Sequence, residues 1–263
     1  MTGTADTVAE MTVTAQATER QPHAILDHES RLLKARKIAR LVERVRPLEG
    51  TSLLDIGAGS GYIASALAEI VGPQGRVAAV DVNDQRRTNE GYEFVQVDGT
   101  ELPFEDGSFD VVLSNHVIEH VGDPSDQLHH LREVRRVLRP GGVCYLAVPN
   151  RWGLVEPHFR LPFLSWVPRR LADPYVRVAR RGTHYDCLLP TRGRAERLFE
   201  KAGFQHEEVT IAAMRVYREL EDLSLPVRML CGAPAPFLRL LGPANPTMIF
   251  LLRPTAKTPE NER

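Results

Sequence analysis

Three glycines at alternating positions follow a short apolar run and mark the first candidate ligand-binding turn. Residues 53–56 are apolar except for Asp55, and they lead into Gly57, Ala58, Gly59, Ser60 and Gly61. Glycine adopts positive φ at low cost and, lacking a Cβ, lets a ligand approach the backbone. A turn of this kind, between a buried strand and a helix predicted from residue 62, suits a nucleotide-like ligand. A dinucleotide fingerprint would need its third glycine at Tyr62, so the spacing argues against NAD and an oxidoreductase.

Acidic residues follow the next two predicted strands. The strand at 76–80 ends in Asp81, where a carboxylate can accept both hydroxyls of a ribose. The strand at 94–97 is followed by Asp98 and Gly99, where a carboxylate can accept from an exocyclic amine such as that of adenine. Three successive strand ends therefore present complementary groups to one adenosine.

Three proton-handling residues, His116, Glu119 and His120, follow the fourth predicted strand. If residues 116–120 form one helical turn, their i, i+3 and i+4 spacing places all three on one face. Histidine is the commonest general base near neutral pH, although either ring could instead cap the helix and Glu119 could orient a neighbour. We expect a catalytic base here, with His120 slightly favoured over His116.

The elements that must position these residues alternate along the chain. Strands are predicted at about 52–56, 76–80, 94–97, 110–114 and 143–148, with helices at 24–45, 62–71, 84–90 and 124–138. This alternation predicts parallel strands with helices on both faces. A last helix at 191–202 precedes strands near 206–212 and at 247–252, which are expected to add an antiparallel edge.

In their order, these motifs resemble the class I S-adenosylmethionine (SAM) dependent methyltransferases over roughly residues 50–150. The matching segments are Asp55 to Gly61, Asp81, Asp98-Gly99, Phe109-Asp110-Val111-Val112, Ser114-Asn115-His116 and Leu138-Arg139-Pro140-Gly141-Gly142. Within the superfamily the chain looks most like the small-molecule branch that includes the quinone-biosynthesis methyltransferases. The resemblance implies a Rossmann-like, doubly wound, seven-stranded α/β sheet with SAM as cofactor. It also implies cofactor contacts: Asp55, Gly57, Ala58, Gly59 and Gly61 at the methionine end, Asp81 at the ribose, Asp98 and Gly99 at the adenine, and Asn115 near SAM.

Methyl transfer from SAM needs little beyond an acceptor held in line at ~3–3.5 Å, but a hydroxyl acceptor gains from a positioned base. The expected activity is therefore O-methylation of a small molecule, with N- or C-methylation and a non-catalytic SAM-binding module as open alternatives. A nucleic-acid amine methyltransferase would usually carry a proline-containing turn after strand four, and residues 114–117 have none. Quinone O-methyltransferases carry a Glu-x-x-Glu-His metal motif at this place. Here His116 takes the first position, so metal binding stays undecided.

Two insertions, 151–190 and 213–245, are predicted to form a substrate cap at the carboxyl ends of the strands. Residues 151–194 hold nine arginines, no lysine, three acids and both tryptophans, a composition suited to a flat or anionic ligand. A lid with packed aromatics and solvated arginines is the alternative. The candidate substrate contacts are Trp152, His158, Phe163 and Tyr185. Apolar, arginine-flanked segments at 159–167 and 223–241 could touch a membrane surface or an amphiphilic acceptor.

Composition sets the remaining bounds. The 263 residues carry a formal charge of −1, so nothing global suggests a nucleic-acid partner. Three separated cysteines without metal or redox spacing favour a reducing cytoplasm, and no apolar run reaches the ~20 residues needed to cross a bilayer. We expect a disordered arm over 1–23, one catalytic domain over 24–254 and a loose tail over 255–263. Nothing in the sequence indicates the oligomeric state.

Overall fold

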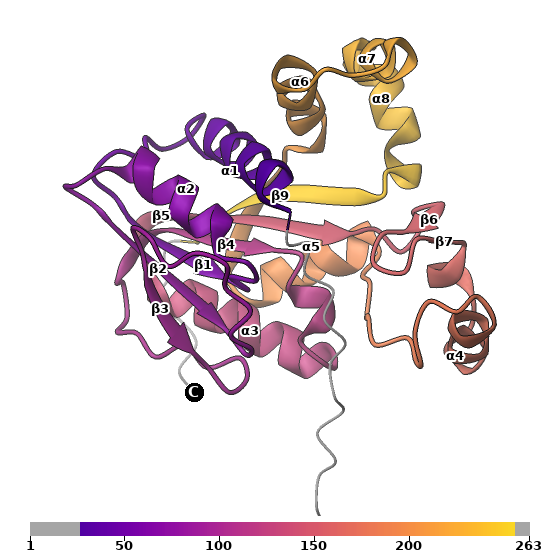
Figure 1. Cartoon of the computed structure of the whole chain (residues 1–263), viewed down its shortest axis with the longest axis horizontal. Coiled ribbons are helices and arrows are strands. Elements are labelled where there is room, and N and C mark those ends of the chain that lie inside the picture. Colours follow the sequence, from indigo (N-terminus) through magenta and orange to yellow (C-terminus); the bar gives the residue numbers. More distant parts are fainter. Residues whose placement is uncertain (1–26, 256–263) are drawn as a thin grey trace, which may run out of the picture.

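A computed structural model describes residues 27–255 of the chain, so the predicted arm and almost all of the predicted tail lie outside the described residues. Seven strands form the main sheet: β1 (Ser52–Ile56), β2 (Arg76–Asp81), β3 (Glu93–Gln96), β4 (Phe109–Asn115), β5 (Leu138–Pro149), β8 (Phe204–Glu208) and β9 (Thr247–Pro254). Their spatial order is β3-β2-β1-β4-β5-β9-β8 (Figure 1). Strands β1 to β5 run parallel, and β9 pairs antiparallel with both β5 and β8. The predicted doubly wound, mostly parallel sheet is confirmed.

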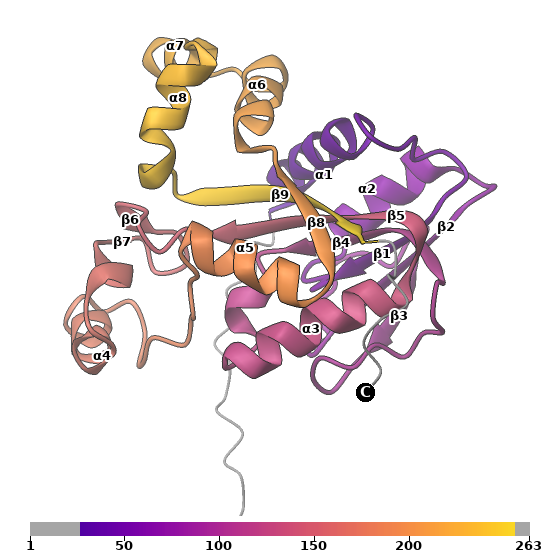
Figure 2. The same ribbon diagram turned by 180° about the vertical axis from the view of Figure 1, so that it is seen from behind.

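Helices cover both faces of the sheet, and each face has its own core. On one face lie α1 (His28–Val42), α2 (Tyr62–Val71) and α6 (Thr210–Leu220), which bury residues such as Ile38 and Leu67. On the other lie α3 (Pro124–Val137) and α5 (Arg192–Lys201), which bury Val134 and Phe199 (Figure 2). Strand β4 is buried along its first six residues because both of its faces are covered. The core thus fixes the strand ends that carry the candidate site.

One predicted helix is absent: residues 84–90 form an irregular connection. Asp84 accepts hydrogen bonds from the backbone N and from Nε and Nη2 of Arg86, at 3.2, 2.8 and 2.7 Å. Such local bonds compete with the helical hydrogen-bond pattern. The Arg86 guanidinium also lies over the ring of Phe94, and Arg87 N donates to Ser60 O at 2.9 Å. The segment is therefore held against the glycine turn as a loop.

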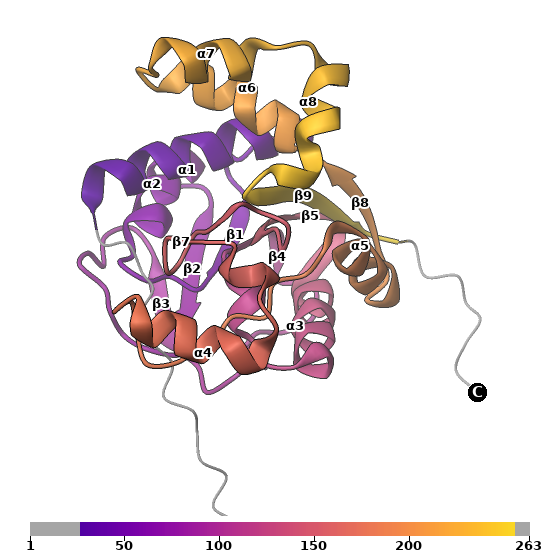
Figure 3. The same ribbon diagram turned by 90° about the vertical axis from the view of Figure 1, so that its right-hand side faces the viewer.

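The first insertion forms a compact cap beyond the carboxyl end of β5. It contains β6 (Val155–Glu156), β7 (Leu161–Pro162), the 3-10 helix η2 (Leu164–Trp166) and α4 (Arg169–Val178). Eight buried residues of this insertion form a core of their own: Phe159, Leu161, Leu164, Ala172, Val176, Tyr185, Cys187 and Leu189. Viewed from the cap side, α4 and the β6-β7 hairpin lie in front of the sheet (Figure 3).

The second insertion is helical and begins earlier than predicted. Strand β8 ends at Glu208, and α6 starts at Thr210, whose hydroxyl donates to Glu208 Oε1 and accepts from Ile249 N. The strand predicted to reach 212 is therefore cut short by this helix start. Helices α7 (Leu225–Gly232) and α8 (Ala235–Leu241) and the 3-10 turn η3 (Gly242–Ala244) complete the unit.

Large apolar side chains remain exposed on both insertions. They are Trp152, Leu154, Val155, Phe163, Trp166, Leu171 and Val178 in the first, and Leu225, Val227, Met229, Leu230, Phe237, Leu240 and Leu241 in the second. Among residues 27–255, no helix combines the length and apolarity needed to span a bilayer.

Candidate active site

A cavity of about 780 Å³ lies where the carboxyl ends of β1, β2 and β4 meet α1 and the cap. Its lining contains much of the predicted site: Asp55, Gly57, Ala58, Gly59, Asp81, Asn115, His116, His120 and His158. Gly61, Asp98, Gly99, Glu119, Trp152, Phe163 and Tyr185 do not line it. The fold thus brings predicted site residues that are up to about a hundred positions apart in the sequence, such as Asp55 and His158, to one cavity.

The glycine turn is shaped by close approach of neighbouring segments. Gly57 has φ 78° and its N donates to Val80 O at 2.8 Å, and a Cβ built there would lie 2.6 Å from Val117 Cγ2. Gly61 is the N-cap of α2 with φ 79°, and a Cβ there would lie 2.1 Å from the Tyr92 hydroxyl. Both positions therefore require glycine. Gly57 lines the cavity, whereas Gly61 does not line it and instead caps the start of α2.

Two carboxylates stand at the neighbouring strand ends. Asp81 Oδ2 accepts from Gly59 N at 2.8 Å and Oδ1 accepts from Asn83 N at 3.1 Å. These bonds fix the carboxylate beside the turn while leaving lone pairs for a ligand. Asp55 is buried, and its burial together with the nearby Asp81 raises the pKa of Asp55 to about 8, against the opposing effect of Arg31. A cationic ligand group would favour its ionised form.

Asn115 supplies an acceptor that the described protein leaves unused. Its Oδ1 is buried and has no hydrogen-bond partner among residues 27–255. A buried unpaired acceptor is costly, so a ligand donor is expected there. This orphaned oxygen and the glycine-built wall fit SAM, whose methionine amine and ribose are donors. Asp98 and Gly99, in contrast, are exposed on the loop after β3.

His116 and Glu119 form a pair at the end of β4. His116 has a left-handed backbone with φ 59°, and its N donates to Ala147 O at 2.9 Å. This conformation brings His116 Nδ1 to 3.3 Å from Oε1 of the fully buried Glu119. Burial raises the pKa of Glu119, but His116 and His158 outweigh it, so the net pKa is lowered and the carboxylate is ionised. Burial lowers the pKa of His116 more than Glu119 raises it, so this ring is neutral at neutral pH.

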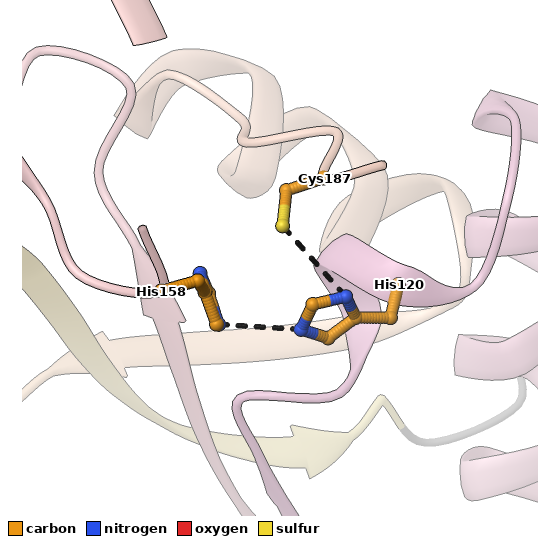
Figure 4. Close-up of side chains that lie close together, drawn as sticks. All are labelled: His120, His158 and Cys187. Atoms are coloured by element: carbon orange, nitrogen blue, oxygen red, sulfur yellow. Dashed lines mark hydrogen bonds between the residues drawn. The ribbon is translucent and has the colours of Figure 1, made fainter. Parts of the chain in front are cut away.

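His120 points elsewhere, which corrects the expected three-residue face. The turn here is a 3-10 helix, η1 (Ile118–His120), preceded by the left-handed His116. Because His116 lies outside this short turn and has a left-handed backbone, the i, i+3 and i+4 positions of a regular helix do not describe these residues. His120 Nε2 lies 3.2 Å from His158 Nε2, and His120 Nδ1 lies 3.8 Å from Cys187 Sγ (Figure 4).

The cap reaches into this cluster through His158. Its Nδ1 lies 2.8 Å from Glu156 Oε1, and its Nε2 lies 3.4 Å from Glu119 Oε1. Burial lowers the pKa of His158, but the nearby carboxylates of Glu119 and Glu156, the latter hydrogen-bonded to Nδ1, raise it to about 9. The ring is therefore an imidazolium at neutral pH, with Nε2–H available to donate to His120 Nε2. That arrangement places the His120 proton on Nδ1, facing Cys187.

The metal role of the quinone O-methyltransferase motif does not fit this arrangement. Within residues 27–255, two groups of donor side chains lie close enough together to hold an ion, His120-His158-Cys187 and His116-Glu119-His158. Both depend on His158, and His116, Glu119 and His120 do not converge as one set. Each group needs a cap residue, His158 or Cys187, that the family's motif does not contain, so the motif residues by themselves do not form a metal site.

The other predicted substrate contacts of the cap lie away from the cavity. Trp152 and Phe163 are half exposed and pack edge-on against Trp166 on the outer surface. Tyr185 is buried in the cap core against Phe159. Their placement supports the alternative of a packed lid for these three residues.

Sequence reasoning missed two basic residues on α1. Arg31 and Lys34 line the cavity beside the strand ends. Their i, i+3 spacing within an otherwise apolar helix face was the available signal. Glu156 lies only two residues from His158, a spacing that does not by itself indicate contact, and Cys187 lies 67 positions from His120, so neither residue carried such a signal.

Comparison with known proteins gives consistent matches. A methyltransferase-domain family model matches residues 54–146. The demethylmenaquinone methyltransferase of Lactococcus lactis subsp. lactis is 32% identical over 184 residues, which cover 63% of this chain and 70% of that protein. A 37.1 kDa protein in transposon Tn4556 of Streptomyces fradiae is 38% identical over 136 residues, 49% of this chain but only 39% of that protein. The crystal structure of a SAM-dependent methyltransferase from Mesorhizobium loti aligns with a TM-score of 0.54 at 16% identity, covering 81% of this chain and 95% of that one.

Proposed function

The chain belongs to the class I SAM-dependent methyltransferases, and from this premise we propose that it methylates a hydroxyl group of a small molecule. Its enzyme class and its cofactor follow from membership of the family. The acceptor, the methylated atom and the roles of individual residues are proposals.

We assign the cofactor end of the cavity to the strand ends of β1 and β2. Asp81 would accept from the ribose hydroxyls, and Asn115 Oδ1 would accept from the methionine amine. Arg31 lies on α1 near Asp55 and would bind the methionine carboxylate. Asp55, Gly57, Ala58 and Gly59 would complete this end, while Gly61 would act by holding the turn.

The pairing of His116 with Glu119 is the observation that carries the proposed O-methylation. When bound, SAM supplies a methyl carbon activated by its sulfonium. His116 is neutral, lines the cavity and directs Nδ1 toward the buried Glu119 carboxylate. With the proton on Nδ1, the Nε2 lone pair can take the proton of an acceptor hydroxyl. Glu119 would hold the tautomer and stabilise the imidazolium that forms, so we name His116 the base and Glu119 its positioning residue.

His120 is less suited to this role. Its Nε2 faces the protonated His158, and its other nitrogen faces Cys187. A ring whose lone pair already accepts a hydrogen bond is a poor proton acceptor for a substrate. We propose that His120 and His158 instead fix the wall that faces the acceptor.

Relatives support a quinone-like or phenolic acceptor. The similar Lactococcus lactis protein is named a demethylmenaquinone methyltransferase. The name supports the acceptor class and does not favour oxygen over ring carbon as the methylated atom, so the pairing of His116 with Glu119 alone supports oxygen. This acceptor class is therefore the first to test.

The test is transfer of a ¹³C-labelled methyl group to a panel of quinols and phenols. The chemical shift of the transferred carbon in the product distinguishes a methoxy group from an N- or C-methyl group. We expect a methoxy product. An N- or C-methyl product from the preferred acceptor would overturn the proposal and leave the family assignment intact.

A further inference from the structure

The charged side chains that line the cavity are divided between its two ends. Its only lining acids among the described residues are Asp55 and Asp81, at the strand ends assigned to the cofactor. The lining cations besides Arg31 are Lys34 from α1 and Arg160 and Arg181 from the cap, which we assign to the acceptor end because Lys34 acts on His116 and both arginines belong to the cap. The acceptor end therefore presents cations and no carboxylate to its occupant.

Lys34 is the cation placed deepest at this end. Its side chain is partly buried, and within residues 27–255 its ammonium makes no hydrogen bond or ion pair. Lys37, one turn later, pairs with Glu221 and lies over the Tyr217 ring. Burial, followed by the nearby charges of Lys37 and Arg31, lowers the pKa of Lys34 to about 8, against the opposing effect of Glu221. A half-buried ammonium among like charges is unfavourable unless an anion joins it.

Lys34 and Arg31 serve different ends of the cavity. They lie three residues apart on α1, about 4.5 Å along the helix axis. Arg31 interacts electrostatically with Asp55, at the cofactor end. Lys34 interacts with His116, the residue that faces the acceptor. The anion that Lys34 lacks is therefore one carried by the acceptor.

We propose that the methyl acceptor carries an anionic group, a carboxylate or a phosphate, which Lys34 binds inside the cavity while Arg160 and Arg181 attract it at the mouth. This rests on the proposed hydroxyl methylation and adds a second recognition element to the same substrate. Exposed arginines at a cavity mouth raise the association rate of anions, and a partly buried ammonium supplies the specific contact.

The test compares probes of equal shape and different charge. Protein saturated with S-adenosylhomocysteine is titrated by calorimetry with 4-hydroxybenzoate and with 4-hydroxybenzamide. A charge-assisted hydrogen bond predicts that the anion binds roughly 10-fold or more tightly than the amide. A third probe, 4-hydroxyphenyl phosphate, distinguishes a carboxylate site from a phosphate site by which anion binds more tightly.

Lysine variants assign the effect. Lys34→Met keeps the aliphatic stem and should abolish the preference for the anion, and Lys34→Arg should retain most of it. Lys201→Met, at an exposed lysine that ends α5, is the control and should bind the probes as wild type does. Thermal unfolding of each variant confirms that it is folded.

A second readout is independent of probe calorimetry. The chain has four lysines, Lys34, Lys37, Lys201 and Lys257, so reductive ¹³C-methylation gives few NMR signals. The Lys34 signal should shift with 4-hydroxybenzoate and not with the amide. Equal affinities, no binding of either probe at tens of millimolar, or a Lys34→Met protein that keeps the preference would overturn the proposal. Weaker S-adenosylhomocysteine binding by Lys34→Met would do so as well, by placing Lys34 at the cofactor. None of these measurements involves methyl transfer, so they fail or succeed independently of which atom is methylated.

Discussion

Replacing Glu156 with glutamine should reduce the pH dependence of the free energy of unfolding, because Glu156 is one of the two carboxylates that keep His158 protonated. His158 Nδ1 lies 2.8 Å from Glu156 Oε1, and both residues are buried at the contact between cap and core. A histidine whose pKa is raised by folding stabilises the folded state fully below its unfolded pKa of 6.5. That stabilisation is lost as the pH rises through the folded pKa of about 9.

The size of the effect follows from this shift. A difference of about 2.5 pKa units at about 1.36 kcal/mol each corresponds to roughly 3 kcal/mol between pH 6 and pH 10. Glu119 and Glu156 share it, so Glu156→Gln should remove about 1–2 kcal/mol of that difference. Glu156 Oε2 also accepts from Phe159 N at 2.7 Å, and loss of this bond adds a cost that does not depend on pH. The informative quantity is therefore the difference in the free energy of unfolding between pH 6 and pH 10.

Urea unfolding of wild type and Glu156→Gln at pH 6, 7.5 and 10 measures this change. The exposed Glu200→Gln serves as the control and should follow wild type throughout. Parallel pH profiles for wild type and Glu156→Gln would refute the argument. So would an NMR titration in which His158 loses its proton below pH 7.

Three further outcomes are expected. Asp81→Ala should weaken S-adenosylhomocysteine binding roughly 10-fold or more in calorimetry while the protein stays folded, since it removes a ribose acceptor; unchanged affinity would remove Asp81 from the site. Gly61→Ala should lower the free energy of unfolding by about 1–3 kcal/mol in denaturant titrations. The added Cβ would lie 2.1 Å from the Tyr92 hydroxyl and 2.7 Å from Thr88 O, at a backbone position with positive φ. A variant as stable as wild type would show that the turn relaxes. Dialysis against a chelator should leave turnover unchanged, because His116, Glu119 and His120 do not converge as one donor set; activity lost with the chelator and restored by a divalent cation would make these residues a metal site.

The sheet was predictable because its signals are local. Apolar runs such as residues 53–56, followed by glycine or acid, place the strands and their ends, and helical spacing places α2 and α3 within one residue. The helix predicted over 84–90 failed for the opposite reason. There the Asp84 contacts with Arg86 and the packing against Ser60 decide the backbone, and periodicity does not show them.

The site was only partly predictable because its chemistry depends on contacts across long sequence distances. The sequence identified His116, Glu119 and His120, yet their directions follow from the left-handed backbone of His116 and the short 3-10 turn. His158 could be proposed as a substrate contact from the composition of its insertion. Its positive charge, however, depends on its burial between Glu119 and Glu156. The aromatic and arginine content of the insertion does not show which rings face the cavity. Trp152, predicted to contact substrate, is instead half exposed.

Single-turnover methyl transfer by wild type, His116→Ala and His120→Ala with one hydroxyl acceptor identifies the catalytic base. Removing a general base should slow transfer ~10²–10⁴-fold while S-adenosylhomocysteine affinity changes less than about twofold. We predict this pattern for His116→Ala and a smaller loss for His120→Ala. Near-normal transfer by His116→Ala would contradict the assignment and leave positioning of the acceptor as the source of catalysis.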